Sequence, residues 1–400
     1  MKVLLLSMPD SFEHTPADAV RMPNAALTSL AGNVDRHHRI AVADLILVQS
    51  RVRETVTRLV AEQAPDVVGL SIMTFQRKTA KAIIRLVRSL RPSAHIVVGG
   101  YDPSLAVDAY TDLSDDGADF IVRGEGEITF RQLLCAIESG KGYDEITGLS
   151  FRGEGSFQHN SERPLSQPDN GDIRLPDRSA RVLTGYTMLG QQADVVETSR
   201  GCTFDCSFCS IISMRGRNFN PFNFDRVLDD IRDAYHRGAR AIFIVDDNIT
   251  LNVRRFAALC QAIIDAGLHS LSYTVQAMTS SIADHGEWLA PLMRKAGFKY
   301  VFLGIENVLA EDLAFLRARS KNTKRENGRR GRIASETACD YLRRNGLYVV
   351  GGLIVGNPDD TQEAVEANLE FARRCVDWPY IQHLHPIRGR SWSVTCDIAG

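Results

Sequence analysis

Short apolar runs alternate with helix-length amphipathic stretches through the first 140 residues of the chain. Two of these stretches, 51–64 and 77–90, place apolar residues on one face and charged residues on the other, as surface helices do. The apolar runs have the length and composition of buried strands; they are KVLLLSM (2–8), RIAVADLIL (39–47), DVVGLSI (66–72), HIVVGG (95–100) and ADFIVRG (118–124). This alternation predicts an α/β fold with a parallel, flavodoxin-like (Rossmann-type) sheet covered on both faces.

A second alternation of the same kind begins near residue 193. Strands are predicted at 194–199, 241–247, 271–277, 300–306, 348–356 and 380–386. Helices are predicted between them, at 224–237, 252–266, 286–296, 332–345 and 361–374. Six strands with intervening helices indicate a partial (β/α)6 TIM-like barrel, in which chemistry takes place at the carboxyl ends of the strands.

The polar stretch between the two alternating regions is rich in Gly, Pro, Asp and Asn. We therefore expect one domain over 1–145, a linker over 146–190 with a short hairpin around 148–157, and the partial barrel over 191–400. The basic run 317–332 is interpreted as a solvated loop, with a mobile lid as the alternative.

Composition narrows the class of protein. The 400 residues are 44% hydrophobic and 24% charged, which is ordinary for a globular protein. The formal net charge of −2 provides no electrostatic case for binding nucleic acid. The first residues contain no apolar run long enough for a signal peptide or a transmembrane segment, so we expect a cytoplasmic protein whose cysteines are free, metal-bound or catalytic.

Glycines cluster where the strands of the first region end. Gly69 lies within the third strand pattern, and the others follow later strands at Gly99, Gly100, Gly124 and Gly126. Each could mark a simple strand-to-helix turn. Together, at one edge of one sheet, they favour a site where the backbone approaches a bulky ligand.

Three cysteines follow the first barrel strand in TSRGCTFDCSFCSI, at Cys202, Cys206 and Cys209. A structural zinc site and a ferredoxin-type cluster both normally use four ligands, and no second cysteine pair follows here. Three thiolates on a tight loop can instead hold three irons of a [4Fe–4S] cluster and leave the fourth iron open. The alternative is that the three cysteines bind no metal.

The spacing Cys-x-x-x-Cys-x-aromatic-Cys, with Phe208 as the aromatic residue, resembles the signature of radical S-adenosylmethionine enzymes. In that family the open iron chelates S-adenosylmethionine, and cleavage of the sulfonium yields a radical that abstracts hydrogen from the substrate. The resemblance implies that Phe208 of the loop contacts S-adenosylmethionine, together with residues at further strand ends: Asp247, Asn248, Gln276, Glu306 and Gly352. Glu306 has an alternative role as a structural carboxylate paired with an arginine.

The first region resembles the cobalamin-binding domain that precedes such barrels in one subclass, through VVGGYDPSL (97–105) and DFIVRGEGEITFRQLL (119–134). The resemblance covers roughly residues 1–383. It implies that strand-end residues hold cobalamin: Ser71, Gly99, Gly100, Gly124, Glu125 and Gly126. The Asp-x-His-x-x-Gly motif for a lower axial ligand begins at Asp35 but has Ile40 in place of glycine, so we expect His37 not to ligate cobalt.

The resemblance implies a methyltransferase that acts on an unactivated carbon of a lipid or secondary metabolite, with methylcobalamin as the donor and a flavodoxin or ferredoxin as electron donor. A radical cyclase or rearrangement enzyme, and a non-catalytic cofactor-binding sensor, are the alternatives. The sequence after His383 departs from the family pattern, so we expect a truncated or frame-altered end near 384–388.

Overall fold

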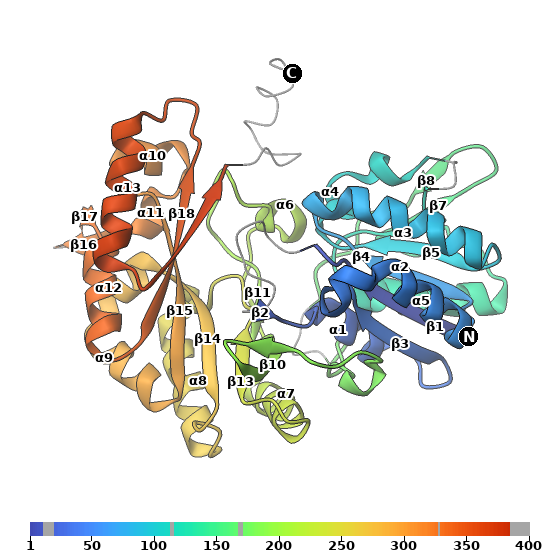
Figure 1. Ribbon diagram of the computed structural model, residues 1–400, viewed down its shortest axis with the longest axis horizontal. Helices are drawn as coiled ribbons and strands as arrows, with labels where there is room; N and C mark the ends of the chain where they lie inside the picture. Colours follow the sequence, from blue (N-terminus) through green and yellow to red (C-terminus); the bar gives the residue numbers. More distant parts are fainter. Residues whose placement is uncertain (11–19, 113–115, 167–170, 327–328, 385–400) are drawn as a thin grey trace. The chain divides into compact units, whose positions relative to one another are not determined.

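A computed structural model of the chain describes residues 1–10, 20–112, 116–166, 171–326 and 329–384 (Figure 1). The chain divides into two units, Met1–Gln192 and Ala193–Gly400. Within the described residues, no helix is both long enough and apolar enough to cross a membrane.

The first unit is built on a seven-stranded sheet with the order β3-β1-β4-β5-β6-β7-β8. The strands are β1 (Lys2–Ser7), β3 (Arg39–Asp44), β4 (Val67–Ser71), β5 (His95–Gly99), β6 (Phe120–Val122), β7 (Leu149–Arg152) and β8 (Phe157–His159). The first five in this order pair in parallel, and their sequence along the chain is 2-1-3-4-5. This order confirms the flavodoxin-like prediction, and it brings the carboxyl ends of the five strands to one edge.

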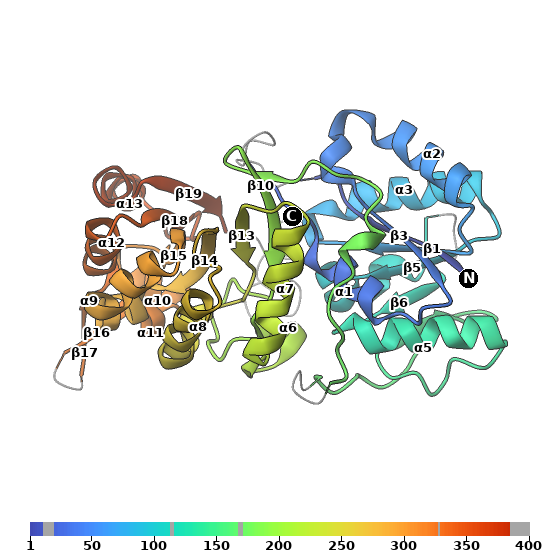
Figure 2. The ribbon, with the colours of Figure 1, turned by 90° about the horizontal axis from the view of Figure 1, so that it is seen from below.

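Helices cover both faces of this sheet, as Figure 2 shows. The helices α2 (Val52–Gln63) and α3 (Arg77–Leu90) lie on one face, and α1 (Ala25–Asn33) and α5 (Gly126–Ser139) on the other. Alternate residues of β1 supply the two cores: Leu4 and Leu6 pack under α2 and α3, whereas Val3 and Leu5 pack under α1 and α5. The part of a strand that is buried on both faces is apolar at successive positions, which explains the unbroken run VLLL (3–6) within β1.

The polar segment after residue 145 contributes to the first sheet. The hairpin expected around 148–157 is present as β7 and β8, and β7 pairs antiparallel with β6. Farther along, the backbone N–H of Ser166 donates a hydrogen bond to Glu125. Much of the segment expected as a linker is therefore packed on the first unit.

The second unit has six parallel strands in the order of the sequence. They are β10 (Gln191–Val196), β13 (Ala241–Ile244), β14 (Ser272–Met278), β15 (Phe298–Glu306), β18 (Tyr348–Val355) and β19 (Trp378–His383). The helices between them are α7 (Phe224–His236), α8 (Val253–Asp265), α9 (Thr279–Lys295), α12 (Ser335–Arg344) and α13 (Gln362–Cys375). They line one face of a curved sheet, which confirms the partial (β/α)6 barrel (Figures 1 and 2).

Three expectations about the second unit have specific outcomes. Helix α9 begins at Thr279 rather than at residue 286. The basic run 317–332 is not a simple loop, because it contains α11 (Arg319–Asn322), β16 (Thr323–Glu326) and β17 (Arg329–Ile333). The expected alteration of the C-terminal end concerns residues that lie almost entirely outside the described ones, which end at Leu384.

Candidate cofactor sites

The three-cysteine loop begins directly after β11 (Ser199–Arg200), which pairs with β12 (Asn220–Pro221). Gly201 has a φ of +92°, and a Cβ at this position would lie 2.1 Å from Oδ1 of Asn218. Only glycine fits there without rearrangement, so Gly201 lets the chain turn from β11 into the loop. Cys202 then forms an isolated bridge with Arg217, which closes the base of the loop.

The three thiols lie near one another and are largely shielded from solvent. Cys206 is buried, Cys202 and Cys209 are half-buried, and all three are free of disulfides. Burial raises the pKa of Cys209 to about 12, and the neighbouring Cys206 and Cys202 add to this shift by charge repulsion. A cationic centre would relieve both effects, because thiolates need a compensating positive charge.

The spacing of these thiols suits a cluster better than a single ion. The sulfurs of Cys202, Cys206 and Cys209 are not all within 4.8 Å of one another. Among the described residues, the one group of three metal-ligating side chains that meets this distance lies in the first unit. The three sulfurs are therefore more widely spread than one zinc ion would draw them. Separate irons of a [4Fe–4S] cluster allow this wider spacing, so the donor set fits the predicted cofactor.

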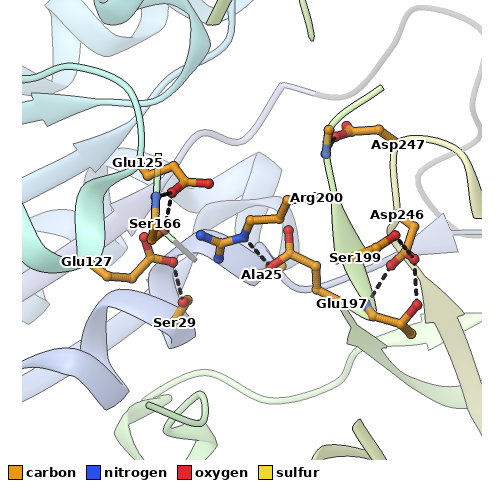
Figure 3. A network of polar contacts seen from close by, with 12 residues as sticks. Ala25, Ser29, Glu125, Glu127, Ser166, Glu197, Ser199, Arg200, Asp246 and Asp247 are labelled. Carbon is orange, nitrogen blue, oxygen red and sulfur yellow. Dashed lines mark hydrogen bonds and ion pairs between the residues drawn. The ribbon is translucent and has the colours of Figure 1, made fainter. Parts of the chain in front are cut away.

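Asp246 and Asp247, which follow β13, brace the segment before the cysteines (Figure 3). Asp246 is 1% exposed and accepts hydrogen bonds from the backbone N–H of Thr198 (2.6 Å), the Thr198 hydroxyl (2.5 Å) and the Ser199 hydroxyl (2.6 Å). Asp247 accepts from the backbone N–H of Gly201 at 2.8 Å and lies 3.5 Å from Arg215. Both carboxylates therefore position the cysteine loop.

Glu306 lies at the end of β15 with a φ of +62°, which is strained for a residue that carries a side chain. Its carboxylate accepts a hydrogen bond from the ammonium of Lys321, which also lies 5.5 Å from the Phe208 ring centroid. Burial disfavours the Lys321 ammonium, but the negative charges of the Glu306 carboxylate and of a Cys206 thiolate outweigh it and hold the pKa of Lys321 above its usual range. Glu306 thus has a lysine as its partner, where the alternative interpretation expected an arginine.

The other residues predicted to contact S-adenosylmethionine lie in varied settings. Phe208 packs against a small hydrophobic core that includes Cys206, Leu313 and Leu316. Asn248 is 8% exposed and accepts from the Thr250 hydroxyl, so its side chain is already used within the fold. Gln276 donates to the backbone carbonyl of Asp246 at 3.4 Å. A Cβ at Gly352 would lie 2.9 Å from the Phe302 ring, so strand packing alone is a sufficient reason for glycine at that position.

The residues predicted to hold cobalamin do meet at the carboxyl edge of the first sheet. Ser71 ends β4 and its hydroxyl accepts from Asn24, while Gly99 ends the neighbouring β5. Gly100 has a φ of +100° and its Cβ would lie 2.8 Å from the carbonyl oxygen of Ile72, so local packing requires glycine. At Gly124, by contrast, a Cβ would meet nothing within 4 Å. The open space at Gly124, next to the strand ends, fits a bulky planar ligand such as a corrin.

Glu125 and Gly126 serve the fold in addition to any ligand. The Glu125 carboxylate accepts from both the backbone and the hydroxyl of Ser166, as Figure 3 shows. Gly126 begins α5, and its Cβ would lie 3.1 Å from the Leu30 side chain. Gly69 is likewise explained by packing, because its Cβ would lie 2.7 Å from Leu5.

His37 lies far from this edge. It precedes the first residue of β3, Arg39, which pairs with Lys2, whereas the carboxyl ends of these strands pair Ser7 with Asp44. The six residues of β3 span about 20 Å. His37 is therefore at the opposite edge of the sheet, in agreement with the expectation that it does not ligate cobalt.

Two residues of the site escaped the sequence analysis. Asp246 stands next to the predicted Asp247 in VDDN, and no local pattern tells which of the two carboxylates points into the core. Lys321 was hidden within the basic run, where its neighbours Arg317 and Arg319 made solvent exposure the natural interpretation. Only the packing of α11 against Glu306 distinguishes it.

Comparison with known proteins agrees with both halves of the chain. Residues 19–134 match the family model for the B12 binding domain, and residues 196–372 match that for the radical SAM superfamily. An uncharacterized methyltransferase of Pyrococcus horikoshii is 28% identical over 387 residues, which cover 96% of this chain and 80% of that protein. The hopanoid C-3 methylase of Methylococcus capsulatus is 28% identical over 80% of this chain, but the chain spans just 55% of it.

A solved structure shares the architecture. The radical S-adenosylmethionine methyltransferase TsrM of Kitasatospora setae, solved with cobalamin and a [4Fe–4S] cluster, superposes with a TM-score of 0.76 at 20% identity, over 100% of this chain and 78% of that one. At this identity the likeness shows the fold alone. The two matched family models place the chain among the cobalamin-binding radical S-adenosylmethionine enzymes, whose cofactors are a [4Fe–4S] cluster, S-adenosylmethionine and cobalamin.

Proposed function

We propose that this enzyme transfers a methyl group to an unactivated carbon of a lipid or secondary metabolite. The observation that carries the proposal is the presence, in one chain, of a strand-end edge that is open at Gly124 and suited to a corrin, and of a three-cysteine loop that leaves one iron free. The names of the Pyrococcus and Methylococcus relatives support methyl transfer as the reaction. A cytoplasmic location and a flavodoxin or ferredoxin as electron donor form part of the proposal.

The cofactors divide the chemistry: the cluster supplies the electron that cleaves one S-adenosylmethionine, and cobalamin carries the methyl group taken from another. Cys202, Cys206 and Cys209 hold the cluster, and Asp246 and Asp247 keep their loop in place. In the first unit, cobalamin binds at the carboxyl edge of the sheet, which we call the corrin edge. Its residues are Ser71, Gly99, Gly100, Gly124, Glu125 and Gly126.

Glu306 and Lys321 offer opposite charges next to the cysteine loop. S-adenosylmethionine carries both an ammonium and a carboxylate on its methionine part, so an acid–base pair can recognise it by exchanging partners. We assign the remaining contacts to Phe208, Asp247, Asn248, Gln276 and Gly352, of which Asn248 and Gly352 have the least free surface.

The test uses S-adenosylmethionine with an isotopically labelled methyl group. Reconstituted enzyme, with a reductant, is incubated with a lipid and metabolite extract from a strain that lacks the gene. We expect 5′-deoxyadenosine and S-adenosylhomocysteine in roughly equal amounts, and one extract component that gains the label. The Cys206→Ala variant is the matched control and should produce neither deoxyadenosine nor a labelled component, although a single methylation of its cobalamin still releases some S-adenosylhomocysteine.

The two alternatives give different results in the same assay. Product formation with deoxyadenosine but without S-adenosylhomocysteine would replace methyl transfer with cyclisation or rearrangement. A protein that binds both cofactors and never consumes S-adenosylmethionine would be a sensor.

A further inference from the structure

A group of metal-ligating side chains lies in the first unit, at the edge of the sheet opposite the corrin edge. His37 and His38 immediately precede β3, and Glu138 lies in the last turn of α5. One ligand atom from each of the three lies within 4.8 Å of the other two. Ligands around a tetrahedral zinc ion are about 3.4 Å apart, so small side-chain rotations would bring all three into coordination.

The side chains already interact with one another. Nε2 of His37 lies 2.8 Å from Oε2 of Glu138, and the His37 and His38 ring centroids are 4.0 Å apart. These contacts already hold the segment before β3 and the end of α5 side by side, with nitrogen and oxygen donors facing each other.

Two further features favour a cation at this place. Nε2 of His38 is buried and has no hydrogen-bond partner within the described residues, so a ligand at this nitrogen would remove a cost in free energy. Glu138 places a negative charge at the carboxyl end of α5, where the helix dipole is already negative and the last turn has no basic residue. The Met1 amino group, 3.8 Å from Glu138, offsets part of that charge, and a divalent ion would offset more.

We propose that His37, His38 and Glu138 bind one divalent transition-metal ion, of the Zn²⁺ or Co²⁺ class. Two imidazoles and one carboxylate form a donor set that these ions favour. The side chains of His37 and Glu138 are 57% and 42% exposed, so water would complete the coordination and the ion would exchange. It would fasten the end of α5 to the segment before β3, about 100 residues away along the chain, and would take no part in the corrin chemistry.

One neighbouring group must respond when the metal binds. The amino group of Met1 lies 3.1 Å from Nδ1 of His38 and 3.8 Å from Glu138. A divalent ion on Glu138 would repel this ammonium, which must then leave the carboxylate or lose its proton. Its contact with Nδ1 of His38 is kept if His38 binds the ion through Nε2. Cys135 lies one turn before Glu138 and is a competing ligand, with its sulfur 3.6 Å from Asp35.

The experiment is a Co²⁺ titration of the full-length enzyme after its cluster has been reconstituted, so that the three loop cysteines are occupied. We expect one equivalent of Co²⁺ to give visible bands typical of nitrogen and oxygen ligands and to raise the melting temperature. His37→Asn and Glu138→Gln should weaken binding at least tenfold, since even residues that merely orient a metal ligand contribute tenfold or more. Both side chains are exposed, so these variants should fold.

The matched controls are His236→Asn, an exposed histidine at the end of α7, and Glu62→Gln, a surface carboxylate paired with Arg58. Both should bind Co²⁺ as the wild type does. The proposal is overturned if all four variants bind alike, or if no stoichiometric binding occurs. Sulfur-to-cobalt charge-transfer bands that disappear in Cys135→Ser would assign the metal to that thiol and would also overturn it.

Discussion

Lys321 and Glu306 form an ion pair that is largely withdrawn from solvent, with side chains 16% and 9% exposed. The pair lies beside Phe208, within the aromatic and thiol surroundings of the cysteine loop. A buried pair of this kind contributes little net stability, because desolvation offsets the attraction, but removing one partner leaves an uncompensated charge. Its presence at this position favours a functional role over a structural one.

This asymmetry gives the first prediction. Lys321→Met should lower the free energy of unfolding by about 3–5 kcal/mol, and the double variant Lys321→Met/Glu306→Gln should recover much of that loss. Denaturant unfolding of the cluster-free chain measures both. Arg344→Met, which breaks the exposed pair with Asp340, is the control and should cost less than about 1 kcal/mol. A double variant no more stable than the single one would contradict the pairing.

The second prediction concerns the cluster ligands. Anaerobic reconstitution of the wild type should yield about four irons per chain and a spin-half signal on reduction that changes when S-adenosylmethionine is added. Cys206→Ala should lose that signal. Cys260→Ala should keep it, because Cys260 is fully buried inside α8 among core residues and its thiol merely fills space. Equal behaviour of the two variants would refute the ligand assignment.

Asp246 gives a prediction about pH. Burial raises the pKa of Asp246 to about 6, above the value near 3.9 of an unfolded aspartate. Between about pH 4 and 6 the unfolded chain loses this proton and the folded chain keeps it, so rising pH lowers the stability of the wild type through this group. Asp246→Asn lacks the titration. The stability of the wild type relative to the variant should therefore fall as the pH is raised from 4.5 to 6.5 in unfolding experiments, and a difference that does not change with pH would rule this out.

The corrin edge can be tested with a matched glycine pair. Gly100→Ala forces a side chain into a φ of +100° and against the Ile72 backbone, so we expect it to cost about 3 kcal/mol and to weaken hydroxocobalamin binding. Gly124→Ala meets no atom within 4 Å and should cost about 1–2 kcal/mol from backbone strain alone. If the added methyl group nevertheless weakens cobalamin binding in Gly124→Ala, the open space at that position belongs to the ligand.

A fifth prediction separates His37 from cobalt. The spectrum of bound hydroxocobalamin should show no sign of histidine ligation and should be unchanged in His37→Ala, because that side chain lies at the opposite edge of the sheet. A fragment for this measurement should comprise Met1–Gln192, since β7 and β8 complete the sheet. A change in the cobalamin spectrum of the variant would show that His37 ligates the cobalt of the corrin.

The parts of this protein that depend on local pattern could be predicted from the sequence alone. Both alternations of strand and helix, the flavodoxin-like strand order and the partial barrel follow from runs such as VLLL (3–6), in which every residue is apolar because both faces are buried. The three cysteines and Phe208 could be identified because their spacing along one loop is itself the chemical requirement.

Tertiary structure decided what depends on contacts between distant segments. Whether Asp246 or Asp247 enters the core is settled by Thr198 and Ser199, almost fifty residues earlier. Lys321 lies in a basic run whose sequence suggests solvent exposure, but α11 brings it against Glu306. The backbone of Ile72 requires glycine at position 100, and the Phe302 ring explains glycine at position 352. The physical reason is the same in each case: burial, charge pairing and close approach are properties of the folded neighbourhood, whereas sequence pattern reports only on the face that a residue presents within its own strand or helix.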